Sequence, residues 1–192
     1  MSTFAAILEF LVIVTNIGTA VVLYPMVKRQ SEIGAVGYVT ACVVECTFIL
    51  VGLLSLLSVV TLRSSGADAG SLVDAGNALV STYNWAFLFG PGLVAGLGNG
   101  ILLGYLMYRS NLVPRRMAML GLIGGPLLAA GFVGVLFGAF EPGSGWQAAA
   151  TAFEFVWELS LGIYLIVKGF RPSAVTSLQT RVPATEPSLA AA

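Results

Sequence analysis

Four glutamates stand inside long apolar stretches of this sequence, and they are the side chains best suited to chemistry. Glu45 and Glu158 lie near the middle of two stretches, Glu154 lies one helical turn before Glu158 on the same face, and Glu9 lies in the outer half of the first stretch. A charged side chain at the centre of a bilayer costs about 2.5–3.5 kcal/mol on insertion scales, so such groups face the bundle interior and pair. No Lys or Arg stands at the centre of any stretch. The carboxyl groups are therefore either neutral or in contact with a water-filled cavity.

Asn99 is the polar residue best placed to join these acids, because it lies just past the middle of the third apolar stretch. We expect Glu45, Glu158 and Asn99 to form one buried polar cluster, with Glu154 leading outward. Two roles are open for such a cluster. It is a pathway or binding site for a proton, an ion or a ligand, or it fastens the helices together at about 0.6–2 kcal/mol per contact.

The residue types give little support for catalysis or for cofactor or metal binding. The sequence contains no histidine, which excludes Ser–His nucleophiles, His-ligated zinc and His-ligated haem. We therefore predict no catalytic residue, no cofactor and no metal site; the surviving enzymatic alternative is acid/base chemistry by Glu154 and Glu158 with Glu45. Cys42 and Cys46 are interpreted as packing residues, because a soft metal such as Cu(I) would need more sulfur ligands.

The elements that position these residues are apolar helices. Of all residues, 57% are hydrophobic and only 9% are charged, against about a quarter charged in soluble domains. Five segments are long enough to cross about 30 Å of hydrocarbon as helices, namely residues 4–27, 35–62, 78–108, 117–140 and 148–167. The predicted fold class is all-α, a polytopic transmembrane helix bundle of one domain over residues 1–171. Ser64–Asn77 is predicted to be a polar loop, and residues 172–192 a disordered cytoplasmic tail.

The basic residues predict the orientation. Of the nine Lys and Arg side chains, only Arg63 lies on one side of the predicted spans; the other eight, on the opposite side, are Lys28, Arg29, Arg109, Arg115, Arg116, Lys168, Arg171 and Arg181. Positive residues are retained in the cytoplasm. The N-terminus is therefore predicted outside and the C-terminus in the cytoplasm.

Glycines form the strongest repeated pattern. Gly92, Gly96, Gly100 and Gly104 recur at every fourth residue of the third span. Such GxxxG ridges let helix backbones approach closely in lipid, so this span is predicted to be the centre of helix packing. The fourth span carries similar pairs, Gly121 with Gly125 and Gly134 with Gly138.

Two proline sites interrupt the predicted spans. Gly90, Pro91 and Gly92 are predicted to break or kink the third helix, and Gly125-Pro126 the fourth. Broken helices expose carbonyl groups that bind ions or substrates in transporters, although prolines also kink transmembrane helices without such a role.

Several motifs in order resemble a known family over residues 5–171. They are Leu23-Tyr24-Pro25, Val44-Glu45, Trp85-Ala86-Phe87-Leu88, Gly90-Pro91-Gly92, Leu103-Gly104-Tyr105, Leu112-Val113-Pro114-Arg115, Gly125-Pro126-Leu127-Leu128 and Trp157-Glu158-Leu159-Ser160. They resemble the uncharacterised bacterial integral-membrane family designated domain of unknown function 4386. The resemblance implies a bacterial cytoplasmic-membrane protein and brings no activity.

Two departures from the family pattern matter. The resemblance implies a further helix ahead of the first one here, which would give six spans with both ends in the cytoplasm. Either the true start lies earlier or this is a five-span variant. The family also places Arg near Cys42, three residues before Glu45. Cys42 removes that counter-charge, so an Arg–Glu site is not carried over to this chain.

The sequence thus predicts a small multi-pass membrane protein organised around buried carboxylates, of transporter, channel or ligand-binding type. The alternative is a structural or accessory subunit that assembles through the glycine-rich faces. The expected partners are the lipid bilayer and either a second copy or another membrane protein, since a five-span bundle this small leaves little room for an enclosed pathway. A net charge of zero predicts no nucleic-acid partner.

Overall fold

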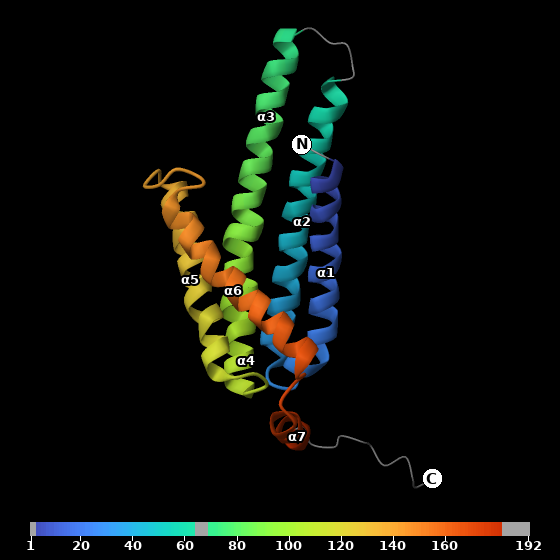
Figure 1. The fold of residues 1–192 in the computed structure, drawn as a ribbon, viewed down its shortest axis with the longest axis vertical. Helices are drawn as coiled ribbons and strands as arrows, with labels where there is room; N and C mark the ends of the chain where they lie inside the picture. The colour runs from blue at the N-terminus through green and yellow to red at the C-terminus, as the bar shows by residue number, and fades with distance from the viewer. Residues whose placement is uncertain (1–2, 64–68, 182–192) are drawn as a thin grey trace, which may run out of the picture.

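The computed structural model describes residues 3–63 and 69–181, and every regular element in them is a helix. The helices are α1 (Thr3–Val27), α2 (Glu32–Arg63), α3 (Ala69–Phe87), η1 (Leu88–Val94), η2 (Gly96–Leu103), α4 (Gly104–Ser110), α5 (Arg115–Leu136), α6 (Gly145–Val167) and α7 (Pro172–Arg181). Elements η1 and η2 are π-helical and join α3 to α4 in one continuous rod (Figure 1). The predicted all-α class is confirmed.

Five helical stretches in the described residues are long and apolar enough to cross a membrane, which confirms the predicted number of spans. The third stretch consists of α3, η1, η2 and α4 together and extends over Gly70–Ser110. The other four are α1, α2, α5 and α6. The chain is a multi-pass membrane-type helix bundle.

The third span begins earlier than predicted. The polar loop predicted for Ser64–Asn77 is wrong for residues 69–77, which are the first turns of α3; residues 64–68 lie outside the described part of the chain. Leu72 and Val73 line a groove there together with Val59 and Leu62 of α2, and the long contact between the two helices outweighs the local glycines and serines. A 41-residue rod is about 62 Å long, twice the hydrocarbon thickness. The α2–α3 hairpin accordingly extends beyond the other helices (Figure 1).

Helix α5 ends at Leu136, four residues before the predicted end of the fourth span. Gly138 adopts the left-handed conformation, with φ of 71°. The amide of Gly138 donates to the carbonyl of Val135 and that of Ala139 to the carbonyl of Gly134, which together form a Schellman cap. The cap stops the helix even though the apolar sequence continues to Phe140.

The predicted disordered tail is wrong for residues 172–181, which form α7, while residues 182–192 lie outside the described part. Ala174 and Leu178 stand one turn apart and are both buried against the apolar cluster that includes Leu112. The Arg171 amide donates to the carbonyl of Leu112 at 3.0 Å, and Arg171 Nη1 donates to Asn111 Oδ1 at 3.0 Å. These contacts dock α7 on the loop that joins α4 to α5.

Replacing Leu178 with serine is expected to release α7 from this loop. The buried leucine side chain anchors the short helix, and its loss lowers the free energy of local opening. Trypsin should then cleave after Lys168, in the segment that leads into α7, about tenfold faster, since cleavage follows the population of the open form. Thr176→Ala is the matched control, because Thr176 is exposed and its hydroxyl bonds only to the carbonyl of Pro172 in the same helix. Equal cleavage rates in the two variants would contradict the docking role of Leu178.

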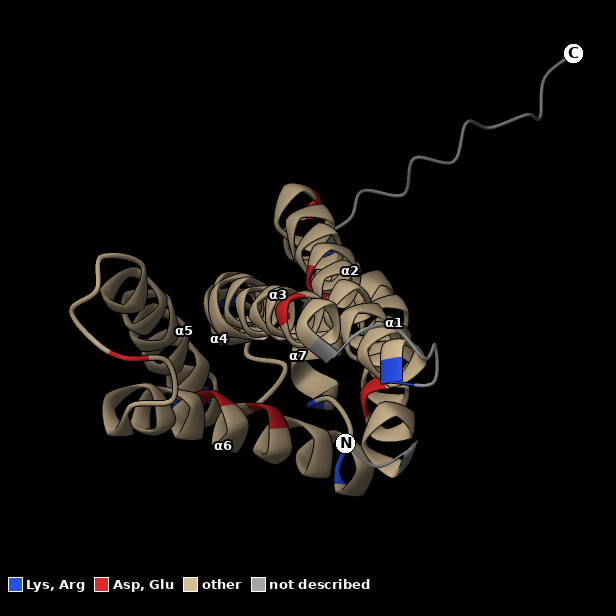
Figure 2. Ribbon diagram, turned by 90° about the horizontal axis from the view of Figure 1, so that it is seen from above, with Lys and Arg blue, Asp and Glu red and all other residues tan. Residues whose placement is uncertain are grey.

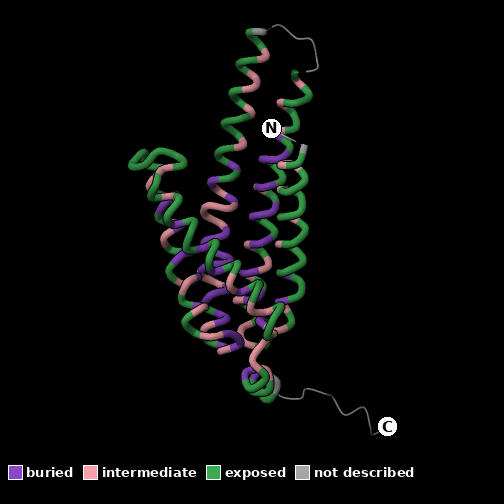
Figure 3. The backbone as a smooth tube through the Cα atoms, viewed as in Figure 1, coloured by how far each residue is buried: buried purple, intermediate pink, exposed green. Residues whose placement is uncertain are grey.

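The core lies at the end of the bundle that holds the α4–α5 loop. Its fully buried side chains include Val27, Met107, Leu112 and Val113, whereas the far ends of α2 and α3 are largely exposed (Figure 3). The same end carries the basic residues that follow α1 and α6, close α4 and begin α5. At the turn after α1, Lys28 Nζ lies 3.0 Å from Glu32 Oε1, and the hydrogen bond and charge of Glu32 raise the pKa of Lys28. Arg63 ends α2 at the opposite end of the bundle.

Candidate functional site

Asn99 lies in the middle of η2, where the helix is wound with π-helical turns. Such turns are rare, occur often at functional sites, and shift the backbone hydrogen-bond pattern. The carbonyl oxygen of Asn99 accepts a hydrogen bond of 2.9 Å from the indole Nε1 of Trp157, which is completely buried on α6. This bond ties α6 to the centre of the third span.

The side chain of Asn99 connects the two central acids. Its Nδ2 donates to Glu158 Oε1 at 2.8 Å and, over a longer distance of 3.5 Å, to Glu45 Oε2. Its Oδ1 accepts from Cys42 Sγ at 3.6 Å. An amide carries two N–H donors and one acceptor oxygen, so every polar group of this side chain is engaged. The structure thus brings Glu45, Asn99 and Glu158 together as one cluster built from α2, η2 and α6.

Glu154 is buried separately from this cluster. It is 4% exposed, and neither carboxyl oxygen has a hydrogen-bond partner among the described residues. Its carboxyl fits a notch between η2 and α5, since a Cβ at either Gly100 or Gly124 would lie 2.9 Å from Glu154 Oε2. The two glycines thus leave room for a carboxyl group as well as for helix contact. Both acidic positions of α6 lie on its side toward the bundle (Figure 2).

Glu9 lies on α1 and takes part in a different contact. The hydroxyl of Tyr83 on α3 donates to Glu9 Oε1 at 3.0 Å, while Glu9 Oε2 is buried without a partner among the described residues. Cys46 Sγ donates at 3.8 Å to the carbonyl of Ile13 on the same helix as Glu9. Glu9 therefore joins α1 to α3 rather than to the Asn99 cluster.

Two cavities meet at the cluster and form one crevice between α1 and α6. The first has a volume of about 340 Å³ and the second about 500 Å³, and both are lined by Val12, Glu45 and Glu158. The first is also lined by Asn16 and Asn99. The second is also lined by Glu9 and Glu154, so its lining includes all four acids that the sequence singled out. We refer to the two cavities together as the α1–α6 crevice.

The predicted packing glycines lie where η2 meets α5. A Cβ at Gly96 would lie 2.8 Å from the carbonyl oxygen of Gly125, and one at Gly100 would lie 2.5 Å from the Cα of Gly125. Gly104 is similarly close to Leu122, at 3.3 Å from its amide nitrogen. Gly92 differs, because its nearest neighbours belong to its own rod. The ridge of the third span is thus covered by a helix of the same chain.

The residues predicted to break the third helix lie within helical backbone. Gly90, Pro91 and Gly92 belong to η1, whose wide turns accommodate the proline without a loop. A Cβ at Gly90 would lie 2.7 Å from the Cβ of Phe48, so this glycine allows η1 to approach α2. The fourth helix likewise continues through Pro126.

The acids are too dispersed for a metal centre. Within residues 3–63 and 69–181, no group of three or more His, Cys, Asp or Glu side chains is placed to hold a metal ion. The same residues contain one ion pair, between Lys28 and Glu32, and it lies away from the crevice. The crevice acids thus have no cationic side chain beside them.

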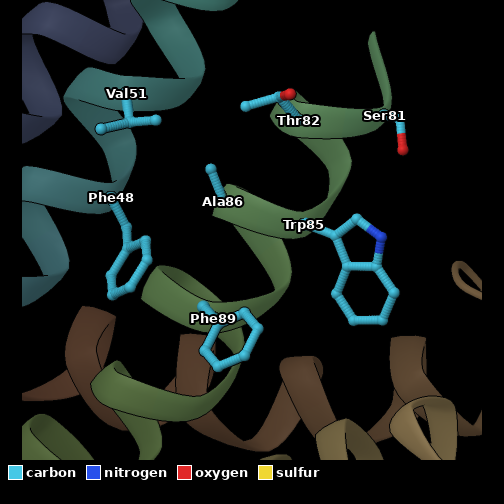
Figure 4. A pocket seen from close by; sticks show the side chains of 7 residues that line it. All are labelled: Phe48, Val51, Ser81, Thr82, Trp85, Ala86 and Phe89. Carbon is cyan, nitrogen blue, oxygen red and sulfur yellow. The ribbon is translucent and has the colours of Figure 1, made fainter. Parts of the chain in front are cut away.

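A second groove, between α2 and α3, offers no comparable chemistry. Figure 4 shows its lining, which is Phe48, Val51, Ser81, Thr82, Trp85, Ala86 and Phe89. The rings of Phe48 and Phe89 stack with centroids 5.7 Å apart, and Trp85 is exposed. No residue in this lining carries a titratable group. The groove is a largely apolar surface of the α2–α3 hairpin.

Two contributors to the site were missed from the sequence. The four-residue spacing favours the Gly121–Gly125 pair and does not single out Gly124. Cys42 was interpreted as packing, yet it donates to Asn99. Its position three residues before Glu45 places both on one helix face, and that spacing was the available signal.

The fold and the crevice define a class of protein, a multi-pass helical membrane protein with carboxyl groups gathered between its spans. The chain belongs to the family described as domain of unknown function (DUF4386), whose model matches residues 3–169. The family resemblance predicted from the motifs is therefore confirmed. No curated protein and no solved structure matches the chain.

Proposed function

We propose that this protein binds and passes a proton or a cationic ligand at the Glu45–Asn99–Glu158 cluster, as a small transporter or ligand-binding protein of the bacterial cytoplasmic membrane. The observation that carries the proposal is the hydrogen-bonded cluster at the junction of two cavities. Carboxyl groups inside a bilayer are costly and mark ion or proton pathways. Glu158 is exposed to the crevice, so its carboxyl can exchange a proton or contact a ligand.

The orientation is part of the proposal. The basic residues beside α1, α4, α5 and α6 gather at one end of the bundle, and Arg63 lies at the other. By the positive-inside rule, the end with α7 faces the cytoplasm and the α2–α3 hairpin projects outward. The crevice then runs through the middle of the bilayer.

The alternative is a structural or accessory subunit that assembles with another protein through its glycine-rich helix faces. The glycine contacts in the structure weigh against assembly through these faces. Gly96, Gly100 and Gly104 are in contact with α5 of the same chain. They are thus unavailable to a second protein. An accessory subunit would have to use another surface, such as the exposed apolar face of α1, which includes Phe10, Val14 and Val21.

Replacing Glu158 with glutamine tests the proposal. In liposomes under a membrane potential, with a pH-sensitive dye inside, the unaltered protein is expected to conduct protons, and Glu158→Gln is expected to reduce the rate about tenfold or more because a glutamine cannot release a proton. Glu141→Gln is the control, since Glu141 is exposed in the α5–α6 loop. If Glu158→Gln lowers thermal stability and leaves flux unchanged, the cluster is a structural fastener and the proposal fails.

A further inference from the structure

We propose that the α1–α6 crevice accommodates a lipophilic organic cation, such as an aryl- or alkyl-substituted ammonium or phosphonium ion, with Glu154 as its innermost counter-charge. This inference rests on the proposed function and names the ligand class of the same site. The ligand enters from the bilayer, between α1 and α6.

The first support is the unpaired state of Glu154. Buried polar side chains almost always have a hydrogen-bond partner, and an exception in a native fold needs an explanation. Glu154 is 4% exposed, both of its oxygens lack a partner among the described residues, and it lines the larger cavity. Gly100 and Gly124 make the notch that holds it. A cation in the cavity would lie beside this residue and supply a counter-charge to its carboxyl group.

The second support is the sign of the charge. The larger cavity is lined by Glu9, Glu45, Glu154 and Glu158, and its lining contains no Lys or Arg. Each of these acids that is ionised favours a cation over an anion. The crevice is therefore selective for positive charge.

The third support is the shape and polarity of the lining, which exclude a bare metal ion. The described acids are not clustered closely enough to ligate a metal. Most of the lining is apolar and includes Leu8, Ile49, Phe87, Leu128 and Phe155. Aromatic faces such as those of Phe87 and Phe155 also attract cations. This lining suits an organic cation, whose charge is carried on an apolar body. The volumes of the two cavities are typical of small-molecule sites.

The fourth support is the route of entry. Residues of α1 form one wall of both cavities and residues of α6 the other. In Figure 1 the tilted α6 crosses the bundle, so that it lies near α1 at the end where both helices finish and diverges from it toward the other end. The crevice therefore opens sideways, toward lipid. A lipophilic cation concentrates in the bilayer and reaches this opening without crossing water.

The test compares two ions of the same shape and opposite charge. Tetraphenylphosphonium and tetraphenylborate are titrated into the full-length protein in detergent micelles by calorimetry, with empty micelles as the blank. We expect tetraphenylphosphonium to bind at least tenfold more tightly than tetraphenylborate. Glu154→Gln and Glu158→Gln should each weaken phosphonium binding about tenfold, the loss of one close charge pair. Glu141→Gln should bind like the unaltered protein.

A measurement on the unaltered protein covers the case in which a variant fails to fold. Dicyclohexylcarbodiimide is a hydrophobic reagent that modifies carboxyl groups inside membranes, and tetraphenylphosphonium should protect Glu154 and Glu158 from it in peptide mass spectra. Each of three outcomes would overturn the inference. They are equal binding of both ions, unchanged affinity in both folded glutamine variants, and an absence of protection from the carbodiimide. If phosphonium fails to bind while Glu158→Gln still reduces proton flux, the ligand class is wrong and the proposed function stands. If both fail, both are withdrawn.

Discussion

Gly125→Ala is expected to destabilise the bundle by about 3 kcal/mol, the upper part of the range for overpacked cores. The added Cβ would meet backbone on every near side, namely the carbonyl oxygen of Gly96, the amide nitrogen of Ile101 and the Cα of Gly100. Backbone cannot rotate aside as a side chain can, so α5 would have to move away from η2. Glu154 would lose its notch, because the same contact between helices forms it. Thermal unfolding of the purified protein measures the loss.

Gly131→Ala is the matched control for this substitution. Gly131 lies in the same helix, and no heavy atom lies within 4 Å of where its Cβ would be. Alanine favours helix over glycine, so this variant should unfold at the same temperature as the unaltered protein or slightly higher. Similar losses in the two variants would mean that helix α5 as a whole, rather than its contact with η2, limits stability.

Asn99→Ala is expected to abolish ligand binding and proton flux and to destabilise the protein by about 1–3 kcal/mol, the cost of leaving buried polar groups unsatisfied. Glu158, Glu45 and Cys42 all lose their shared partner. Flux in liposomes and thermal unfolding measure the two effects. Asn77→Ala, at an exposed position of α3, is the control and should change neither.

Asn99→Asp separates the donor role of Asn99 from its volume. The aspartate keeps the size of the side chain and replaces both N–H donors with an acceptor, next to two acids. It should therefore lower stability and flux at least as much as Asn99→Ala. An aspartate variant that behaves like the unaltered protein would show that the carboxyl groups do not depend on donation from position 99.

Particular residues show how far sequence reasoning reached. Glu45, Glu158 and Asn99 were expected in one cluster because unpaired acids and an amide within hydrocarbon must turn inward, and the structure joins them. The sequence could not predict which atoms form the hydrogen bonds, since a bond between α2 and η2 depends on the rotation and tilt of both helices. The π-helical turns of η2 contribute to that rotation, and the local sequence does not predict them.

The expectations that failed depended on contacts between distant segments. Residues 69–77 have the composition of a loop and become helical by packing along α2. Residues 172–181 have weak apolar periodicity and fold because Leu112 and Asn111 provide a docking surface. Local helix propensity contributes little to the stability of a helix in a protein. Packing against a neighbouring segment outweighs it wherever such a segment is close.

The sequence by itself determined that this chain is a five-span helical membrane protein, because the number and length of apolar segments and the family motifs are local properties. The tertiary structure alone decided that the glycines of η2 pack against α5, that Glu154 lies unpaired in a notch between Gly100 of η2 and Gly124 of α5, and that the four acids line one crevice between α1 and α6. The physical reason is that hydrophobic length places a helix in the membrane, whereas its rotation, tilt and neighbours are set by close contacts between residues far apart in the chain.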